Sequence, residues 1–341
     1  MNKNYIALLS FLLCVISCAD NVEHSLEEAG MKNVCKLEEN LIPIKLPQSF
    51  DILDDNRFVM TDWEGVYLYD FNGKQLSQIG ISGRAQYEYN RPSIVRVYDN
   101  KIYVWSSATL KFIEYDSDGT PIAEYEYNSA VTDFRVSEDE IFIYTAGRKV
   151  ANIIDVYDKS SETVTNSLTP STREHRFSLR NISSSPMYYD GESLVYASKD
   201  KLNIYLYSPE SKQTEQISSF SSKSFKVESV ADTTILYTDW DKTLKYYNEN
   251  LIALFICPSD KGYYMIAAEG KFEMKNNEII DGTRYIALYD IRSKDSKHVA
   301  SYKYSSIATQ HLFAYYNGKL YIIDHSMDEN DDIYTMKSMD L

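Results

Sequence analysis

The stretch from Arg57 to Ile79 reads RFVMTDWEGVYLYDFNGKQLSQI and decides the fold class. It contains three short runs, Arg57–Thr61, Val66–Asp70 and Gln75–Ile79, separated by polar turns. The second turn carries the Asp and Gly that are typical of tight hairpins. Runs of about five residues that are apolar or alternate in polarity predict β-strands, because a helix needs longer runs with a 3.6-residue period. The stretch therefore predicts three consecutive antiparallel strands.

The same unit recurs along the chain, and its second run usually ends in Tyr-Asp or a similar pair. The repeated position is occupied by Tyr69, Tyr115, Tyr157, Tyr207, Tyr247, Tyr289 and Met339. The interval is roughly 45 residues, which suits one four-stranded blade of a β-propeller. Seven copies predict an all-β propeller of seven blades, with six as the alternative if one copy is degenerate. An open ring would expose sheet edges, so we expect an N-terminal strand, Leu41–Leu46, to complete the last blade.

Composition agrees with this fold and excludes one class of partner. The 341 residues are 44% hydrophobic and include 30 Tyr, and aromatic side chains are favoured on pleated strands. The formal net charge is −15. Because an acidic surface repels phosphate backbones, nucleic acid is not an expected partner.

The N-terminus has the pattern of an export signal. A single Lys precedes the apolar run Tyr5–Ser17, which is too short to span a bilayer and has the length of a signal-peptide core. The run ends in Val-Ile-Ser-Cys18, which resembles a bacterial lipobox. That resemblance implies cleavage after residue 17 and lipidation of Cys18, which would anchor the protein to a membrane. The alternative is a plain secretory signal with an incidental cysteine.

These observations predict three segments: a lipoprotein signal peptide (residues 1–17), a lipidated Cys18 with a polar tether (18–40) and a propeller domain (41–341). We expect the protein in the cell envelope, facing the periplasm or the cell surface. Cys35 and Cys257 remain in the body of the chain. An exported protein can form disulfides, but their spacing gives no signal for a bridge, and two separate thiols are favoured.

The first repeat, Arg57–Ile79, resembles an NHL-type repeat, with an apolar strand ending in Asp and an Asp-x-x-Gly-Lys turn before the third strand. The following link, Gly80–Glu88, is similar to the glycine-rich link of six-bladed propeller lipoproteins common in gut Bacteroidota, although Ala85, Gln86 and Tyr87 replace the Gly-Pro-Gly usual there. The resemblance implies a lipid-anchored propeller and favours six blades over seven.

Candidate ligand-binding residues cluster at the ends of second strands. The tripeptide Thr-Asp-Trp occurs at Asp62–Trp63 and again at Asp239–Trp240, and second-to-third-strand turns share one face of a propeller. Tryptophan beside carboxylates suits stacking on a sugar whose hydroxyls donate hydrogen bonds. The predicted ligand-binding residues are Asp62, Trp63, Trp105, Arg148, Asp239, Trp240, Asp324 and His325. The structural alternative is that each Asp caps its turn and each Trp packs between blades.

No sequence motif establishes catalysis, a metal or a cofactor. The chain has no HExxH, GxSxG or P-loop pattern, and its Asp-rich turns fit hairpin chemistry better than calcium binding. The acidic run Asp328–Asp332 is expected to be a solvated loop, with a weak cation site as the alternative. The leading hypothesis is a non-catalytic binding module for a glycan, a peptide or an envelope protein. Alternatives are a propeller carbohydrate hydrolase or lyase with paired carboxylates, first Asp62 and Asp239, and a structural subunit of an envelope complex.

Overall fold

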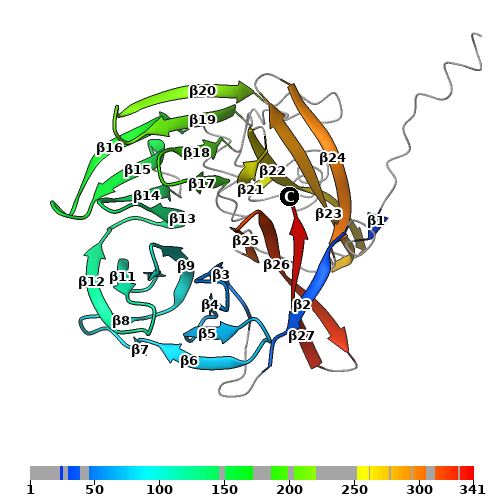
Figure 1. Cartoon of the computed structure of the whole chain (residues 1–341), viewed down its shortest axis with the longest axis horizontal. Helices are drawn as coiled ribbons and strands as arrows, with labels where there is room; N and C mark the ends of the chain where they lie inside the picture. The colour runs from blue at the N-terminus through cyan, green and yellow to red at the C-terminus, as the bar shows by residue number, and fades with distance from the viewer. Residues whose placement is uncertain are drawn as a thin grey trace, which may run out of the picture.

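The computed structural model describes residues 24–25, 30–38, 46–145, 150–171, 186–198, 203–219, 252–260, 262–275, 278–292, 295–304, 312–328 and 331–341. These residues contain no α-helix and form six four-stranded antiparallel sheets, one of them with an added short parallel strand. The sheets are arranged radially around a central axis, as Figure 1 shows. The protein is therefore an all-β, six-bladed propeller.

Each blade runs from an inner to an outer strand. Blade one comprises β3 (Ser49–Ile52), β4 (Arg57–Thr61), β5 (Val66–Asp70) and β6 (Gln75–Ile79); blade two comprises β9 (Pro92–Tyr98), β10 (Lys101–Ser106), β11 (Lys111–Tyr115) and β12 (Pro121–Glu126); blade three comprises β13 (Val131–Val136), β14 (Glu140–Thr145), β15 (Asn152–Asp158) and β16 (Thr163–Pro170). Between blades one and two lies a two-stranded parallel pair, β7 (Ile81–Ser82) and β8 (Glu88–Tyr89).

The second half of the ring follows the same order. Blade four comprises β17 (Met187–Tyr189), β18 (Leu194–Ala197), β19 (Asn203–Ser208) and β20 (Gln213–Ser219); blade five comprises β21 (Ile252–Ser259), β22 (Gly262–Lys275), β23 (Glu278–Arg292) and β24 (Asp295–Tyr304), with β1 (His24–Ser25) added in parallel to β24; blade six comprises β25 (Phe313–Tyr316), β26 (Lys319–Asp328), β27 (Asp331–Asp340) and β2 (Lys32–Lys36).

The Asp-rich turns are hairpin turns, as the sequence predicts. The Asp70 carboxylate accepts hydrogen bonds from the backbone N–H groups of Asn72 and Lys74, both at 2.9 Å, and Gly73 takes a positive φ of 87°. Asp116 accepts in the same way from the backbone of Asp118 at 3.0 Å and Thr120 at 2.8 Å. In these turns the carboxylate oxygens bind backbone donors, which explains the recurrence of Asp without a cation.

The repeated tyrosine, in the third strand of a blade, lies in the core between neighbouring blades. Tyr69, Tyr115, Tyr157 and Tyr207 are all buried in the cores between sheets. Tyr69 stacks on Phe58 with ring centroids 5.2 Å apart. Much of the tyrosine content is therefore explained by packing, since each ring buries a large apolar surface.

The ring closes through an N-terminal strand, but not the one predicted from the sequence. The outer strand of blade six is β2, which pairs antiparallel with β27 at the other end of the chain (Figure 1). Cys35 and Leu37 are buried in the core between blades six and one, whereas Leu46, the last residue of the predicted strand, is half-exposed and residues 41–45 lie outside the described residues. Burial of these apolar side chains explains why the closing strand is residues 32–36. This strand lies inside the segment that the sequence predicts to be a tether.

Six of the seven repeat copies correspond to the six sheets, so the alternative blade count is correct. The copy that ends at Tyr247 falls in residues 220–250, outside the described residues. Cys35 and Cys257 are buried free thiols in different clusters, as the sequence favours. Burial raises the pKa of Cys35 to about 11. The described part of the chain contains no helix long and apolar enough to cross a membrane.

Candidate functional site: the mouth of the central channel

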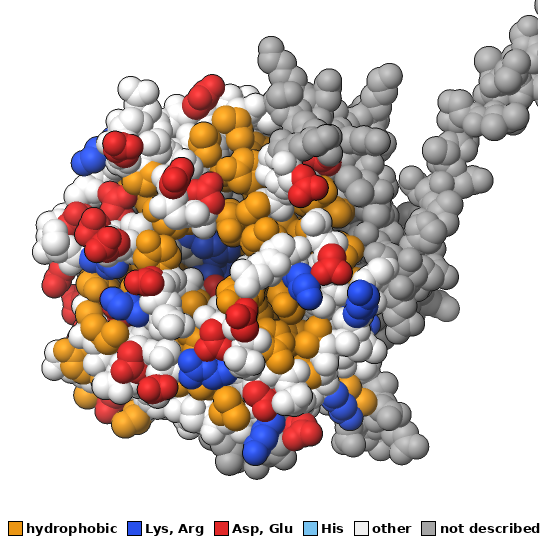
Figure 2. Space-filling view, viewed as in Figure 1, with side chains coloured by type: hydrophobic (Ala, Val, Ile, Leu, Met, Phe, Trp, Pro, Cys, Tyr) orange, Lys and Arg blue, Asp and Glu red, His pale blue; other side chains and the backbone are white. Residues whose placement is uncertain are grey.

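A cavity of about 360 Å³ lies where the innermost strands of all six blades meet. Its lining also includes turns that join the first and second strands of blades two and four, with Asp99 and Asp190. It therefore opens at the end of the ring where first-to-second-strand turns lie. A space-filling view shows a hollow at the centre of the ring with basic side chains at its bottom and mainly hydrophobic and acidic side chains around it (Figure 2).

Two arginines reach this cavity from first strands, each with an apolar residue on either side. Arg96 lies between Val95 and Val97 in β9, and Arg135 lies between Phe134 and Val136 in β13. Successive side chains of a strand point to opposite sides, so the flanking apolar residues enter the cores between blades while each arginine takes the other side. The same local pattern in adjacent blades thus places two guanidinium groups at the channel.

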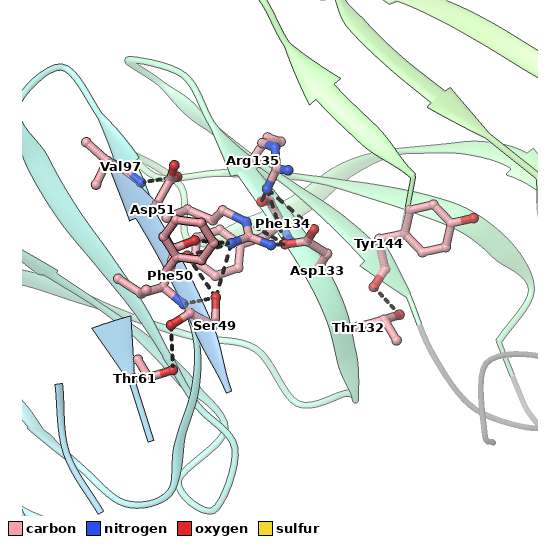
Figure 3. A network of polar contacts seen from close by, with 12 residues as sticks. Ser49, Phe50, Asp51, Thr61, Val97, Thr132, Asp133, Phe134, Arg135 and Tyr144 are labelled. Atoms are coloured by element: carbon pink, nitrogen blue, oxygen red, sulfur yellow. Dashed lines mark hydrogen bonds and ion pairs between the residues drawn. The ribbon is translucent and has the colours of Figure 1, made fainter. Parts of the chain in front are cut away.

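Arg96 joins the first three blades through a buried network, and Figure 3 labels two of its partners, Ser49 and Asp133. Its Nε and Nη2 each lie 2.8 Å from Asp133 Oδ1 in blade three, and its Nη1 donates to Ser49 Oγ in blade one at 3.1 Å and to the Val95 carbonyl at 2.8 Å. A buried ion pair is costly to desolvate and is tolerated when its remaining donors are also satisfied. Arg96 is therefore a structural clamp beneath the cavity.

Arg135 has the opposite character, because most of its donors are unused. Its Nη1 lies 3.3 Å from Asp133 Oδ1 and donates to the Phe134 carbonyl at 2.9 Å (Figure 3). Its Nε and Nη2 make no hydrogen bond within the described part of the chain. The side chain is only 12% exposed and lines the cavity. Burial lowers the pKa of Arg135, but a guanidinium remains protonated in proteins.

Asp51 supplies a carboxylate to the same cavity. Its Oδ1 and Oδ2 accept backbone hydrogen bonds from Ile52 and from Val97 in the next blade, both at 3.0 Å. Burial raises the pKa of Asp51, and the positive charges of Arg96 and Arg135 act in the opposite direction. Each carboxylate oxygen has a second lone pair, so Asp51 can still accept a hydrogen bond from a ligand.

Aromatic rings form the wall of the cavity on the side of blades four to six. Tyr188 meets Tyr315 edge-on with centroids 5.7 Å apart, and Phe255 stacks on Phe313 at 6.2 Å. The Arg135 guanidinium carbon lies 5.9 Å from the centre of the Phe255 ring. Burial raises the pKa of Tyr188, so its hydroxyl is a hydrogen-bond donor at neutral pH. The site combines aromatic faces with groups of both charges.

Asp62 and Trp63 lie at the other end of the ring, in the turn between β4 and β5. Asp62 is 1% exposed, and its Oδ1 accepts backbone hydrogen bonds from Glu64 at 2.7 Å and Gly65 at 2.8 Å. Trp63 is 47% exposed. Asp62 therefore caps its turn, which is the structural alternative, while Trp63 is an accessible ring whose ligand role remains a prediction.

Three of the other predicted residues, Trp105, Asp324 and His325, are described, and each has contacts of its own. Trp105 is 2% exposed and packs against Phe112, with ring centroids 4.6 Å apart, in the core between blades two and three. Asp324 pairs with Lys337 at 2.9 Å, and His325 Nε2 lies 2.6 Å from Asp332 Oδ1. Arg148, Asp239 and Trp240 lie outside the described residues, as does Cys18. Among the residues described, no group of three or more His, Cys, Asp or Glu could hold a metal ion.

Arg96, Arg135, Asp51 and Tyr188 were not predicted as site residues. The signal that marks three of them is a charged residue with an apolar residue on each side in a first strand, as in Val-Arg96-Val, Phe-Arg135-Val and Phe-Asp51-Ile, whereas Tyr188 carries no such signal. A charge at such a position must be paired or face a cavity. The sequence pattern favours turn residues at second-strand ends instead, because the tripeptide Thr-Asp-Trp repeats there.

Comparison with known proteins supports the fold but shows no family for this chain. No family model matches the chain, and no curated protein matches it. A solved Bacteroides fragilis protein described as exported aligns over 92% of this chain and 96% of its own, with a TM-score of 0.62 and 15% identity. A member of the DUF4221 family from Bacteroides vulgatus aligns over 92% and 99%, with a TM-score of 0.64 and 12% identity. These similarities support the propeller fold over nearly the whole length of both structures.

Proposed function

We propose that this protein is a lipid-anchored binding module of the cell envelope that takes a small glycan or peptide at the mouth of its central channel. The observation that carries the proposal is the cavity lined by all six blades, with a mostly buried arginine, Arg135, whose Nε and Nη2 make no hydrogen bond to the described residues. Concave sites with aromatic walls and a few convergent polar groups are the usual form of small-ligand pockets.

The chemistry of the mouth favours binding over catalysis. Asp133 is held by Arg96, and both oxygens of Asp51 accept backbone hydrogen bonds. Of the described carboxylates in the lining, Asp51 is bonded to backbone N–H groups through both oxygens, and Asp99 and Asp190 are exposed at the rim, so the mouth does not present the enclosed pair of carboxylates that a hydrolase of this kind would use. The mouth instead offers hydrogen bonds and aromatic contacts, which are sufficient for recognition.

The envelope location rests on the N-terminus and on the structural neighbours. The sequence from Tyr5 to Cys18 has the pattern of a lipoprotein signal, and a structural neighbour from Bacteroides fragilis is described as exported. Lipidation of Cys18 would keep the propeller at a membrane surface. We therefore expect Cys18→Ser to release the protein from the membrane fraction. Unchanged partitioning of this variant would contradict lipidation at Cys18.

A thermal-shift screen tests ligand binding at the mouth. A ligand at about 100 times its dissociation constant stabilises a protein by about 2.7 kcal/mol. We would screen the Cys18→Ser protein against oligosaccharides and short peptides, and then repeat each hit with Tyr315→Ala and Trp63→Ala. Loss of the shift in Tyr315→Ala alone supports the proposal, and loss in Trp63→Ala alone moves the site to the opposite end of the ring.

A further inference from the structure

The unused donors of Arg135 specify one part of the ligand. Nε and Nη2 present two parallel N–H groups, a geometry that matches a carboxylate in a bidentate pair. Phe255 lies over the guanidinium, and Asp133 and the Phe134 carbonyl occupy only Nη1. Because Arg135 lines the cavity and keeps 12% of its side chain exposed, a ligand oxyanion in the cavity can accept hydrogen bonds from these two donors.

The acidic groups of the cavity favour a second charge on the ligand, a positive one. Besides the two arginines, its lining contains Asp51 in the wall and the exposed Asp99 and Asp190 at the rim. A ligand with only a negative charge meets these three carboxylates on entry. A ligand with only a positive charge meets Arg135 and Arg96. A ligand that carries both charges is favourable at both places, because each charge has a partner of opposite sign.

We propose that the channel mouth binds a small zwitterion, a free amino acid or a short peptide, whose carboxylate pairs with Arg135 and whose ammonium group faces Asp51. The rings of Tyr188 and Tyr315 contact the ligand side chain and contribute cation–π attraction to the ammonium group. A cavity of about 360 Å³ accommodates a molecule of this size. This inference rests on the proposed function and names its ligand class.

Matched probes test the two charges separately. Binding to the full-length protein in detergent is measured by calorimetry with the common amino acids and the dipeptide Ala-Phe. For whichever binds most tightly, the N-acetyl and carboxamide forms each remove one charge. We expect each blocked form to bind about tenfold or more weakly, because a charge-assisted hydrogen bond is lost. Free amino acids and the dipeptide differ in the spacing of their charges, so their relative affinity identifies the source.

Variants assign the charges to residues. Arg135→Lys keeps the positive charge but removes the two parallel donors, whereas Arg135→Gln removes the charge as well as the donors. Each variant should bind the zwitterion about tenfold or more weakly. Arg57→Gln is the matched control, because Arg57 pairs with Asp54 and Asp118 outside the cavity. Asp51→Asn should weaken the zwitterion and leave the weak binding of its N-acetyl form unchanged. Melting temperatures are recorded for every variant, so that loss of folding is distinguished from loss of binding.

The outcomes separate this inference from the proposed function. Equal binding of a zwitterion and its blocked forms, or unchanged binding by folded Arg135→Lys and Arg135→Gln, overturns the inference. Binding of neutral oligosaccharides without any zwitterion, with Tyr315→Ala reducing it, also overturns the inference while the proposed function stands. Failure of every amino acid, peptide and oligosaccharide to bind contradicts both.

Discussion

The two ends of the propeller use polar residues in different ways. At the end where first-to-second-strand turns lie, Arg135 is mostly buried and its Nε and Nη2 have no partner in the described residues. At the other end, Asp62 Oδ1 is occupied by the backbone of its own turn. A repeated polar residue at a turn is explained by the turn itself, whereas an isolated charge in an inner strand requires another explanation. The difference identifies the channel mouth as the better candidate site.

Asp133→Ala tests the mouth with the largest expected effect. This substitution leaves Arg96 buried without its carboxylate, and breaking a buried ion pair in this way costs about 3–5 kcal/mol of unfolding free energy. Asp118→Ala is the control, because the Asp118–Arg57 pair is exposed and contributes at most about 1 kcal/mol. Denaturant unfolding measures both. Similar losses for the two variants would mean that the network does not hold the blades together.

Trp105 and Trp63 provide the next test, at the ends of equivalent strands in blades two and one. Trp105→Ala should destabilise the fold by about 3–5 kcal/mol because the ring is enclosed in the core. Trp63→Ala should change stability by less than about 0.5 kcal/mol, since its ring is half-exposed. Chemical unfolding gives both values. A large loss for Trp63→Ala would assign that ring to the fold and remove it as a ligand candidate.

Asp62→Ala should have a smaller effect. The variant loses a charged acceptor for two backbone N–H groups, which we expect to cost about 1–3 kcal/mol without changing ligand binding at the mouth. Asp62→Asn keeps an oxygen at this position and should recover part of the loss. The measurement is unfolding free energy together with the affinity of any ligand found. Weaker binding in a stable Asp62→Ala protein would return the site to the second-strand turns.

The smallest expected effect is a difference in how stability depends on pH between Asp51 and the carboxylates of the turns. Burial raises the folded-state pKa of Asp51, so its stabilising contribution is present below pH 3.8 and is lost as the pH rises through the folded pKa. Asp158 is the opposite case, because hydrogen bonds in its turn lower the pKa to about 2. Its contribution is present above pH 3.8 and is lost as the pH falls through about 2.

Unfolding measured from pH 2 to pH 7 checks both signs. Relative to Asp51→Asn, the wild-type protein should become less stable as the pH rises above about 4; relative to Asp158→Asn, it should become less stable as the pH falls. If the wild-type protein gains stability with rising pH relative to Asp51→Asn, the arginines dominate over burial and the carboxylate is more strongly paired than described above.

The sequence was sufficient for the fold class, because local patterns determine it. Alternation in the strands, Asp-Gly turns and the recurring tyrosine all arise from contacts within a blade or between neighbours, so they appear at regular intervals. Closure of the ring by an N-terminal strand was predicted, but the residues of that strand were not. β2 is far in sequence from its partner β27, so no local pattern indicates the pairing. A protein beginning at residue 41 would lack this strand.

The candidate site was harder to predict because it is assembled from single residues of six blades. Arg96, Arg135 and Asp51 come from separate blades, and no spacing rule relates them. The pairing of Arg96 with Asp133 and the free donors of Arg135 appear only when the inner strands meet. A search for charges within apolar first strands would have found the arginines, but not which of them is already satisfied.

The most direct test of the account is a crystal structure of the protein soaked with the probe that stabilises it most. We predict density in the channel mouth, in contact with Tyr188 and Tyr315 and within hydrogen-bond distance of Arg135 Nε or Nη2. Density beside Trp63, with the channel mouth empty, would contradict the central claim that the ligand enters the ring at the end where Arg135 lies.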